Sequence, residues 1–158
     1  MKLSIKDKAP NFSLPDQKNK KHTLSDYRGT WVLLYFYPKD DTPGCTKEAC
    51  EMRDNFSAFE KSNAMVFGVS ADSAERHATF AKKYELDFFL LSDQDKKIIK
   101  LYGAWAKKKF MGREYMGIKR MSFLIDPKGV IRKIYDPVKP GLHAEEALAD
   151  IKLFSTQK

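Results

Sequence analysis

The chain has two cysteines, Cys45 and Cys50, and both stand in one short segment, DDTPGCTKEAC. Two sulfurs cannot complete a four-ligand zinc site by themselves. The histidines that could add ligands stand far away along the chain, at His22, His77 and His143. The cysteines are also too far apart for a Cys-x-x-Cys redox motif. We therefore expect no bound metal, and what remains is a pair of small buried apolar residues or a cysteine with chemistry of its own.

The residues in front of Cys45 form a helix-start signal. Thr42 suits the N-cap position, and Pro43 suits the first helical position, where its missing N–H would have no partner anyway. Gly44 and Cys45 then fall in the first turn. Unpaired amides and the positive end of the helix dipole favour an anion there, and a thiolate is an anion. The pattern therefore indicates that Cys45 could react as a thiolate.

An apolar stripe runs along the helix that this signal begins. At about 100° per residue, the stripe falls within about 40° of the direction of Cys45. Its members are Ala49, Met52, Phe56 and Phe59. Cys50 points about 140° away, beside Arg53 and Ser57 on the polar flank. We expect Cys45 to face the protein interior and Cys50 to lie nearer to water.

The elements around this segment indicate one α/β domain that spans residues 1–158. The apolar run WVLLYFY predicts a central strand that ends at Pro38, and it is too short to cross a membrane, which needs about 20 residues. Next come a helix over residues 45–63, a second buried strand over 65–71 and a helix over 73–84. Strand, helix and strand in this order form a βαβ unit, whose strands are parallel.

The second half of the chain adds a strand, a helix, a hairpin and a last helix. A short strand over residues 88–93 precedes a helix near 96–102. The segment MSFLIDPKGVIRKIY predicts a hairpin with a Pro-Lys-Gly turn, and the last helix begins near His143. Residues 1–28 are expected to form an added N-terminal hairpin with a lysine-rich tip, KNKK. This order predicts a thioredoxin-like fold with a central mixed sheet flanked by helices.

The stretch over residues 103–118 is longer than most connections that lack secondary structure. It carries three aromatic side chains, those of Trp105, Phe110 and Tyr115. We interpret it as a wall of the site or as a surface on which a partner docks, in preference to a simple hairpin.

The composition favours an ordinary solvated surface. The net charge of +8 comes mainly from lysines spread over predicted helices and turns, and no known nucleic-acid-binding motif accompanies it. We therefore expect neither a nucleic-acid partner nor a membrane partner. The first residues, MKLSIKDKAPNFS, lack the apolar stretch of a signal peptide, which favours a cytoplasmic protein. In that compartment a pair of cysteines is more often catalytic than structural.

The predicted setting of Cys45, at the carboxyl edge of a parallel sheet, suits attack on an electrophile whose leaving group takes the negative charge. A peroxide fits, because the sulfur bonds to one oxygen, the other leaves as hydroxide or alkoxide, and a sulfenic acid remains. The amides of Gly44 and Cys45, the Thr42 hydroxyl and one cation could stabilise the developing charge. Cys50 is the candidate thiol that could then condense with the sulfenic acid to a disulfide.

These residues also carry a resemblance to a known family. Pro38, Thr42 and Cys45 reproduce the pattern P-x-x-x-T-x-x-C of the peroxiredoxins. The segment YFYPKDDTPGCTKEAC resembles the Q-type branch, also called the bacterioferritin comigratory proteins. The segments SLPDQKNKKHTLSDYRG, YGAWAKKKFMGREYMGIKR, SFLIDPKG and KPGLHAEEAL are similar to that branch as well, so the resemblance covers nearly the whole chain.

The resemblance implies a role for each matching residue. Cys45 would be the peroxidatic cysteine and Cys50 the resolving cysteine on the same helix, as in an atypical 2-Cys peroxiredoxin. Thr42 and Arg120 would bind the peroxide oxygens, and Pro38 would shield the thiolate. Arg120 on its own could equally be a solvated residue at the start of a strand.

Two more residues near this site bear on the resemblance and on the charges. Glu48 also matches a family position, whereas Met121 departs from the branch, which usually has a small hydroxylic residue after the arginine. Asp40, Asp41 and Glu48 add negative charge near the cysteine sulfur and oppose a thiolate. A cation such as Arg120 is therefore needed to offset them.

The expected activity is that of a thiol peroxidase that reduces hydrogen peroxide and organic hydroperoxides without a cofactor. By resemblance, thioredoxin or a similar dithiol reductant would recycle it, and it would act as a monomer or weak homodimer. A thiol-disulfide oxidoreductase is an alternative, disfavoured by the missing Cys-x-x-Cys. A redox-sensing or chaperone-like binding protein could use the same cysteine without turnover.

Overall fold

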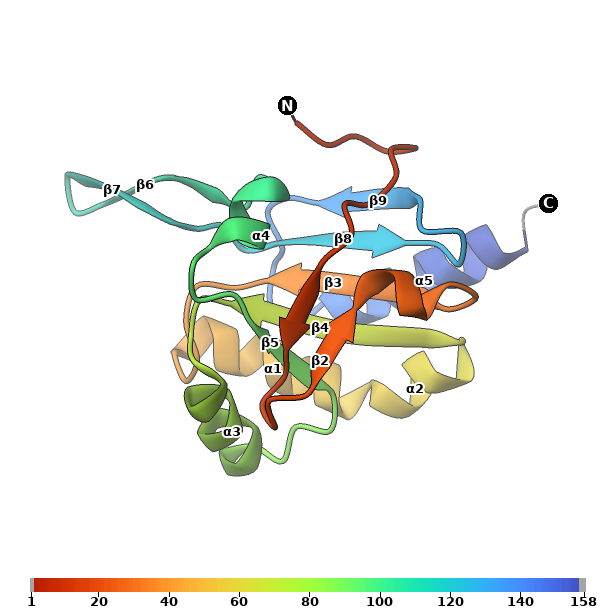
Figure 1. The fold of residues 1–158 in the computed structure, drawn as a ribbon, viewed down its shortest axis with the longest axis horizontal. Helices are drawn as coiled ribbons and strands as arrows, with labels where there is room; N and C mark the ends of the chain where they lie inside the picture. The colour runs from red at the N-terminus through yellow and green to blue at the C-terminus, as the bar shows by residue number, and fades with distance from the viewer. Residues whose placement is uncertain (1, 157–158) are drawn as a thin grey trace.

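A mixed sheet of five strands forms the centre of the computed structural model, which describes residues 2–156 (Figure 1). Across the sheet the strands follow the order β5-β4-β3-β8-β9. Their bounds are Trp31–Phe36 for β3, Ala64–Ser70 for β4, Phe89–Ser92 for β5, Met121–Ile125 for β8 and Ile131–Tyr135 for β9. β3 is buried along its whole length because other elements cover both faces of the sheet, which explains its uninterrupted apolar run.

The pairing of β3 decides which segments meet at its carboxyl end. β3 runs parallel to β4, with Phe36 opposite Val69, as the βαβ pattern predicts. On its other side β3 runs antiparallel to β8, with Phe36 opposite Met121. The carboxyl ends of β3 and β4 and the beginning of β8 therefore lie at the same edge of the sheet. The loop after β3 and the residue before Met121 meet at that edge.

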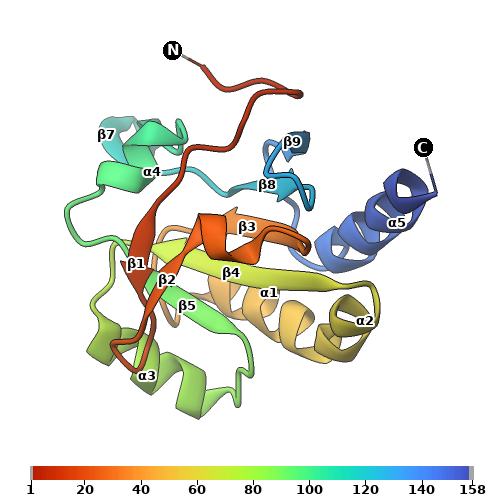
Figure 2. The same cartoon turned by 45° about the vertical axis from the view of Figure 1, so that its right-hand side comes forward.

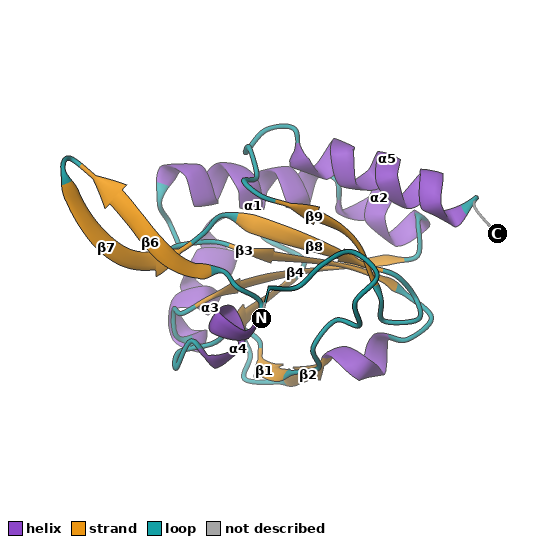
Figure 3. Cartoon of the chain, turned by 90° about the horizontal axis from the view of Figure 1, so that it is seen from above, coloured by secondary structure: helices purple, strands orange, loops and turns teal. Residues whose placement is uncertain are grey.

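Helices cover one face of the sheet, and an N-terminal hairpin with a short helix covers the other (Figures 2 and 3). On the first face lie α1 (Pro43–Asp54), α2 (Phe56–Lys61) and α5 (His143–Ser155), with α3 (Ala74–Lys83) packed near β5. On the second lie β1 (Ser13–Pro15), β2 (Lys21–Thr23), the 3-10 helix η1 (Leu24–Tyr27) and α4 (Lys97–Leu101). None of the helices within residues 2–156 combines the length and the apolar character needed to cross a membrane.

Side chains that alternate along β3 contribute to two cores. Leu33 and Tyr35 pack on the side of α1, whereas Leu34 and Phe36 pack on the side of the N-terminal hairpin and α4. The predicted apolar stripe of the first helix joins the core on the α1 side. In that stripe Ala49, Met52 and Phe59 are buried, and Phe56 is half-buried. The stripe therefore fixes α1 to the sheet with Cys45 facing inward.

The helix predicted over residues 45–63 is in fact two helices. α1 ends at Asp54 and α2 begins at Phe56, and Asn55 between them leaves helical geometry at φ −106° and ψ 8°. The side-chain amide of Asn55 donates a hydrogen bond to the Glu51 carbonyl oxygen at 2.8 Å. Such a side-chain bond competes with the hydrogen bonds of the helix itself. The prediction of one continuous helix was therefore wrong at Asn55.

Residues 103–118 form a hairpin, the structure that the sequence interpretation had disfavoured, and whether this hairpin is a wall of the site or a docking surface stays a prediction. β6 (Trp105–Phe110) pairs antiparallel with β7 (Arg113–Ile118) through the two-residue loop Met111-Gly112. Both loop residues have positive φ, 52° and 80°, as a type I′ turn requires. Methionine is not a typical residue for the first position of that turn, so the turn was hard to predict from the residue types. The hairpin extends well beyond the body of the protein (Figure 1).

The other predicted elements are confirmed. The N-terminal hairpin pairs Ser13 with Thr23, and the β8–β9 hairpin turns at residues 126–130. Helices α3, α4 and α5 lie within two residues of their predicted starts, and α5 begins at His143.

Candidate active site

Cys45 lies in the first turn of α1, directly after the loop that follows β3. Thr42 takes the N-cap position by its backbone, because its carbonyl oxygen accepts the amide of Thr46 at 2.8 Å. The predicted N-cap position of Thr42 is confirmed, but its side chain makes no capping hydrogen bond. The hydroxyl instead donates to the Lys39 carbonyl oxygen at 2.8 Å. The first amides of α1, including that of Gly44, therefore remain directed out of the helix end.

The two cysteines differ in exposure as predicted, and both are unpaired thiols. Cys45 is only 2% exposed and belongs to the core on the α1 side. Cys50, farther along the same helix, is half-buried. Pro38, which the resemblance assigns to shielding the thiolate, is half-buried just beyond the end of β3.

Arg120 contacts Cys45 from the start of β8, whereas Cys45 itself lies on α1. It immediately precedes β8, whose first residue Met121 lies opposite Phe36, so the register brings Arg120 to the carboxyl end of β3. Its Nη2 lies 3.3 Å from Cys45 Sγ, and its Nη1 lies 3.0 Å from Glu48 Oε1. Burial alone would lower the pKa of Arg120, but the sulfur and the carboxylate hold it above its ordinary value. The structure thus brings together the two side chains that the sequence paired.

Met121 departs from the family pattern, but the contact between Arg120 and Cys45 is present all the same. Met121 is buried among the apolar residues on the hairpin side of the sheet, away from α1. Because side chains alternate along β8, the residue after the arginine points to the face opposite the cysteine. The structure therefore shows Arg120 beside Cys45 with methionine in place of the small hydroxylic residue.

Gly44 gives the guanidinium room to approach the sulfur. A Cβ added at Gly44 would lie 2.9 Å from Nη2 of Arg120, which is closer than a real Cβ contact. The obstructed atom is the end of a long flexible side chain, so a residue larger than glycine would displace Arg120 rather than the backbone. Gly44 therefore matters for the position of Arg120 as well as for its own amide.

Glu48 is a buried carboxyl group on the same side of α1 as Cys45. Burial raises its pKa to about 7, although the contact with Arg120 acts in the opposite direction. Its Oε1 accepts from Arg120, whereas Oε2 has no hydrogen-bond partner among the described residues. The buried hydroxyl of Tyr35 also lacks one within the same residues, and burial followed by the nearby Glu48 raises the pKa of Tyr35 far above its ordinary value. Glu48 can therefore exchange its proton near neutral pH.

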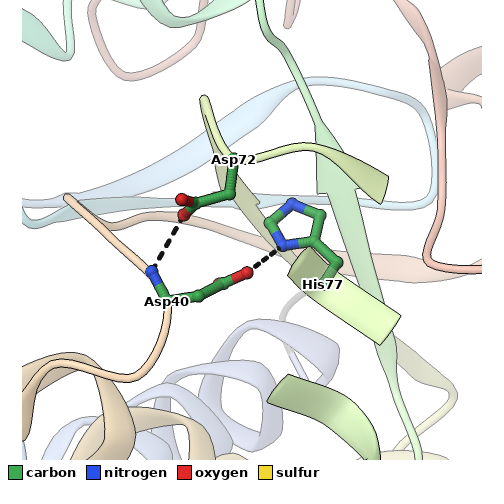
Figure 4. A group of neighbouring side chains, drawn as sticks. All are labelled: Asp40, Asp72 and His77. Carbon is green, nitrogen blue, oxygen red and sulfur yellow. Dashed lines mark hydrogen bonds and ion pairs between the residues drawn. The ribbon is translucent and has the colours of Figure 1, made fainter. Parts of the chain in front are cut away.

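A buried hydrogen-bond network holds the loop in front of α1 (Figure 4). Asp40 accepts from the Tyr37 hydroxyl at 2.5 Å and lies 2.6 Å from Nδ1 of His77. Its amide donates to Asp72 at 2.8 Å, and Nε2 of His77 donates to the Leu91 carbonyl oxygen at 3.0 Å. These bonds tie the loop after β3 to the loop after β4 and to α3. The position of the helix start is thus fixed from outside the helix.

Sequence reasoning missed His77 as part of this network. His77 stands three positions before Phe80 and seven before Tyr84, on the apolar side of α3, and it is fully buried. A histidine on the apolar side of an amphipathic helix needs a buried polar partner. The position of His77 on the apolar side of α3 could therefore have predicted a buried polar partner, and the structure shows that this partner is Asp40.

The same network contains the residues that could hold a metal. Asp40, Asp72 and His77 present ligand atoms within 4.8 Å of one another. Both oxygens of Asp40 already form hydrogen bonds, one with the Tyr37 hydroxyl and one with His77 Nδ1, and Asp72 pairs with Arg76 at 3.2 Å. A cation would have to displace these donors and stand beside a guanidinium. The cluster is therefore explained by its hydrogen bonds.

The three acids expected to oppose a thiolate are not equivalent. Asp41 forms an ion pair with Lys83 at 2.8 Å on the surface, which together with the Tyr84 hydroxyl lowers the pKa of Asp41. Asp40 is engaged with His77. Glu48 alone of the three contacts Arg120, so it is the acid that competes with the sulfur for that cation.

Comparison with known proteins identifies relatives over nearly the whole length. Residues 5–134 match the model of the AhpC/TSA family. The chain is 45% identical to peroxiredoxin Bcp of Bacillus subtilis over 152 residues, which cover 96% of this chain and 97% of that protein. It is also 45% identical to peroxiredoxin Bcp of Escherichia coli K12 over 150 residues, which cover 95% and 96% of the two chains.

Solved structures resemble this fold closely. A cysteine-to-serine mutant of Xylella fastidiosa PrxQ superposes with a TM-score of 0.92 at 36% identity, over 98% of this chain and 99% of that one. The bacterioferritin comigratory protein of Xanthomonas campestris, whose trapped intermediate and ligand complexes concern alkyl peroxide reduction, gives 0.87 at 33% identity over 92% of each chain. The thioredoxin-like fold expected from the sequence is thereby confirmed.

Gly44→Ala should slow the reaction of Cys45 with iodoacetamide several-fold, because the new methyl group pushes Arg120 away from the sulfur. The rate is measured in a Cys50→Ser background, with Arg120→Ala as the slow reference. Gly44 does not have a positive φ, so alanine should not lower the unfolding temperature. If the Gly44→Ala variant is alkylated as fast as the Cys50→Ser protein that retains Gly44, then Gly44 does not control the position of Arg120.

Glu48→Gln should flatten the dependence of stability on pH. The pKa of Glu48 is raised from 4.5 to about 7 in the folded protein, so the fold favours the protonated carboxyl group. That contribution is complete below about pH 4.5 and is lost as the pH rises through 7, which costs about 2 to 3 kcal/mol. Urea unfolding between pH 4.5 and 7.5 should detect this loss in the parent and not in Glu48→Gln. The exposed Glu60→Gln is the matched control, and a profile of Glu48→Gln like the parent's would refute the assignment.

Proposed function

The chain belongs to the AhpC/TSA family and is a peroxiredoxin, a thiol-dependent peroxidase of the Bcp type, and we propose that it works through a Cys45 sulfenic acid. In this proposal hydrogen peroxide and organic hydroperoxides are the oxidants. Cys50 resolves the sulfenic acid as an intramolecular disulfide, and thioredoxin or a similar dithiol reductant restores the two thiols. One chain holds every residue of the cycle, which is consistent with a monomer or weak homodimer.

One observation carries the proposal, namely the contact between Arg120 and Cys45. A buried thiol is normally inert, because burial disfavours the charged form. Here a guanidinium lies 3.3 Å from the sulfur, and the sulfur sits in the first turn of a helix whose amides are unpaired. Both features favour a thiolate in a site that excludes water. A sulfur that only filled space in the core would need neither of them.

In the proposed first step the Cys45 thiolate attacks one peroxide oxygen. The S–O bond forms as the O–O bond breaks, the sulfur loses two electrons, and the other oxygen leaves as hydroxide or alkoxide and takes up a proton. Arg120 and the amides of Gly44 and Cys45 are suited to stabilise the charge on that oxygen. The Thr42 hydroxyl donates its hydrogen bond to the Lys39 carbonyl oxygen, so its own oxygen is suited to accept a hydrogen bond from the incoming hydroperoxide.

Pro38 completes the proposed peroxide site. Its ring is half-buried between the end of β3 and the helix start and would help to exclude water from the thiolate. A dry site strengthens the interaction of the sulfur with Arg120.

Resolution by Cys50 requires α1 to open. Both cysteines lie inside α1, and residues five apart in a helix have Cα atoms about 8.7 Å from each other. A disulfide usually requires a Cα separation below about 6.8 Å, and the two sulfurs also point to different sides of the helix. We therefore propose that the beginning of α1 unwinds before the disulfide forms, with water released as the sulfenic acid condenses with the Cys50 thiol.

The cycle needs a source of dithiol equivalents. Each turnover leaves one disulfide, which two thiols of the reductant convert back to Cys45 and Cys50 thiols. Such reductants operate where the compartment keeps thiols reduced, and on that ground we place the cycle in the cytoplasm.

Two rival functions use the same cysteine. A thiol-disulfide oxidoreductase would exchange disulfides with protein substrates, but Cys45 and Cys50 lack the Cys-x-x-Cys spacing. A redox sensor or chaperone-like protein would be oxidised once without turnover. Many turnovers of peroxide with a dithiol donor distinguish the peroxidase from both.

Replacing Cys45 and replacing Cys50 should have different effects on peroxide consumption. Cys45→Ser should abolish peroxide consumption, because the attacking sulfur is missing. Cys50→Ser should consume about one equivalent of peroxide and then stop as a sulfenic acid, which dimedone labels and mass spectrometry detects. If Cys50→Ser reacts no faster than Cys45→Ser, the two roles are assigned wrongly.

Oxidation should loosen α1 locally. Hydrogen exchange of reduced and peroxide-oxidised protein should show lost protection at residues 46–52, since the disulfide cannot form on the intact helix. Amides of β4 and α3 serve as internal controls and should keep their protection. Equal protection of residues 46–52 in both states would rule out the opening step, and so would a disulfide between cysteines of two chains.

A further inference from the structure

The β6–β7 hairpin exposes four large apolar side chains. Phe110 is 66% exposed, Met111 87%, Tyr115 47% and Met116 49%. Single exposed apolar residues are ordinary on a protein surface, whereas a cluster on one projecting element indicates an interaction site. Figure 1 shows that this hairpin reaches away from the sheet at the edge where β3 ends.

The register of the hairpin divides these side chains between two faces. Lys108 lies opposite Tyr115, and Phe110 lies opposite Arg113, and opposite residues of an antiparallel pair share a face. We call the face with these four residues the inner face of the hairpin. It combines two exposed aromatic side chains with two cations.

The inner face adjoins the candidate active site. Lys108 lies along the hairpin toward its base, because a Cβ added at Gly117 would be 2.9 Å from the Lys108 side chain. Its Nζ donates to the Ile118 carbonyl oxygen at 2.9 Å, two residues before Arg120. Burial lowers the pKa of Lys108, Arg120 lowers it further, and Cys45 acts in the opposite direction. A partner protein bound to this face would therefore lie beside the N-terminal end of α1, which carries Cys45.

The charge of the hairpin selects the kind of partner. The segment KKKFMGRE holds four cations and one acid, and that acid, Glu114, pairs with Lys107 at 3.4 Å. Lys109 and Arg113 form no ion pair with any residue of the described range 2–156. A second copy of this chain, also at +8, would bring like charges to the contact. An acidic partner is therefore favoured.

We propose that the inner face of the hairpin docks the protein dithiol that reduces the Cys45–Cys50 disulfide. The partner would be apolar around its reactive thiol, to meet Phe110 and Tyr115, and acidic at the rim, to meet Arg113. Encounters between redox proteins are small and transient, below about 1,200 Å² of total buried surface, which is a scale that one hairpin can serve. This inference rests on the proposed function and names the surface that its reductant uses.

The docked step is a thiol-disulfide exchange. A thiolate of the partner attacks one sulfur of the disulfide, forming a mixed disulfide and releasing the other sulfur of this chain as a thiolate. The second thiol of the partner then attacks the mixed disulfide and loses its proton. The partner ends as a disulfide, and this chain ends as two thiols. A small dithiol can perform the same exchange without docking.

The experiment compares a small reductant with a protein reductant. Peroxide consumption is followed with dithiothreitol, and separately with thioredoxin that thioredoxin reductase and NADPH recycle. One variant removes the aromatic side chains of the inner face, Phe110→Ser with Tyr115→Ser, and a second reverses the charge at the tip of that face, Arg113→Glu. The matched control, Lys152→Glu with Leu153→Ser, makes the same types of change on α5, where Leu153 is 55% exposed.

Both hairpin variants should keep the dithiothreitol rate and lose about tenfold or more in kcat/KM for thioredoxin. The parent's kcat/KM for thioredoxin should fall with added salt more steeply than that of the charge-reversal variant. The α5 control should match the parent with both reductants. A parent that dithiothreitol does not sustain would refute the proposed function itself.

Three results would overturn the docking surface while leaving the peroxidase proposal intact. The first is a parent that dithiothreitol sustains and thioredoxin does not. The second is a set of hairpin variants that equal the parent with thioredoxin, or that lose the dithiothreitol rate to the same extent. The third is unchanged thioredoxin kinetics together with hairpin-dependent sedimentation on vesicles of phosphatidylglycerol and phosphatidylcholine, which would assign the hairpin to a membrane surface.

Discussion

The guanidinium of Arg120 is the interaction on which the rest of the site depends. It joins the start of β8 to α1 by contacting both Cys45 and Glu48, two groups that are each buried and each capable of negative charge. One cation cannot fully compensate two buried anions. Because the pKa of Glu48 is about 7, the charge that competes with the sulfur for Arg120 changes near neutral pH. The sheet register that aligns Phe36 with Met121 therefore has a direct electrostatic consequence.

A second constraint is that α1 serves two incompatible purposes. The folded helix supplies the unpaired amides that favour a thiolate at Cys45, yet the same helix holds Cys45 and Cys50 too far apart for a disulfide. The network of Asp40 and His77 lies just before the segment that we propose to unwind. It anchors the chain at the sheet edge, so the unwound segment has a fixed starting point. Refolding after reduction can then restore the contact with Arg120.

The sequence predicted the features that depend on periodicity and missed those that depend on one side chain's choice of partner. The apolar run of β3 and the apolar stripe of α1 predicted that Cys45 faces the interior and that Cys50 lies nearer to water. The Thr42 hydroxyl, by contrast, could bond to the helix amides or to Lys39, and its type does not decide between them. The break at Asn55 has the same origin. The partner of Asp40 lies in α3 and becomes visible only once the chain is folded.

Glu51 links α1 to the beginning of α5. It stands next to Cys50, and its carboxylate accepts the amides of Gly141 and Ala144 at 2.5 Å, where α5 begins. A carboxylate at that position satisfies unpaired amides and the positive end of the helix dipole. If α1 unwinds through Glu51, α5 loses this cap and the loop before it loses its contact with α1. That loop also bonds to the Arg120 backbone through the amide of Val138. In the proposed cycle, opening of α1 would therefore also loosen the loop that is bonded to the Arg120 backbone, next to the cation that contacts Cys45.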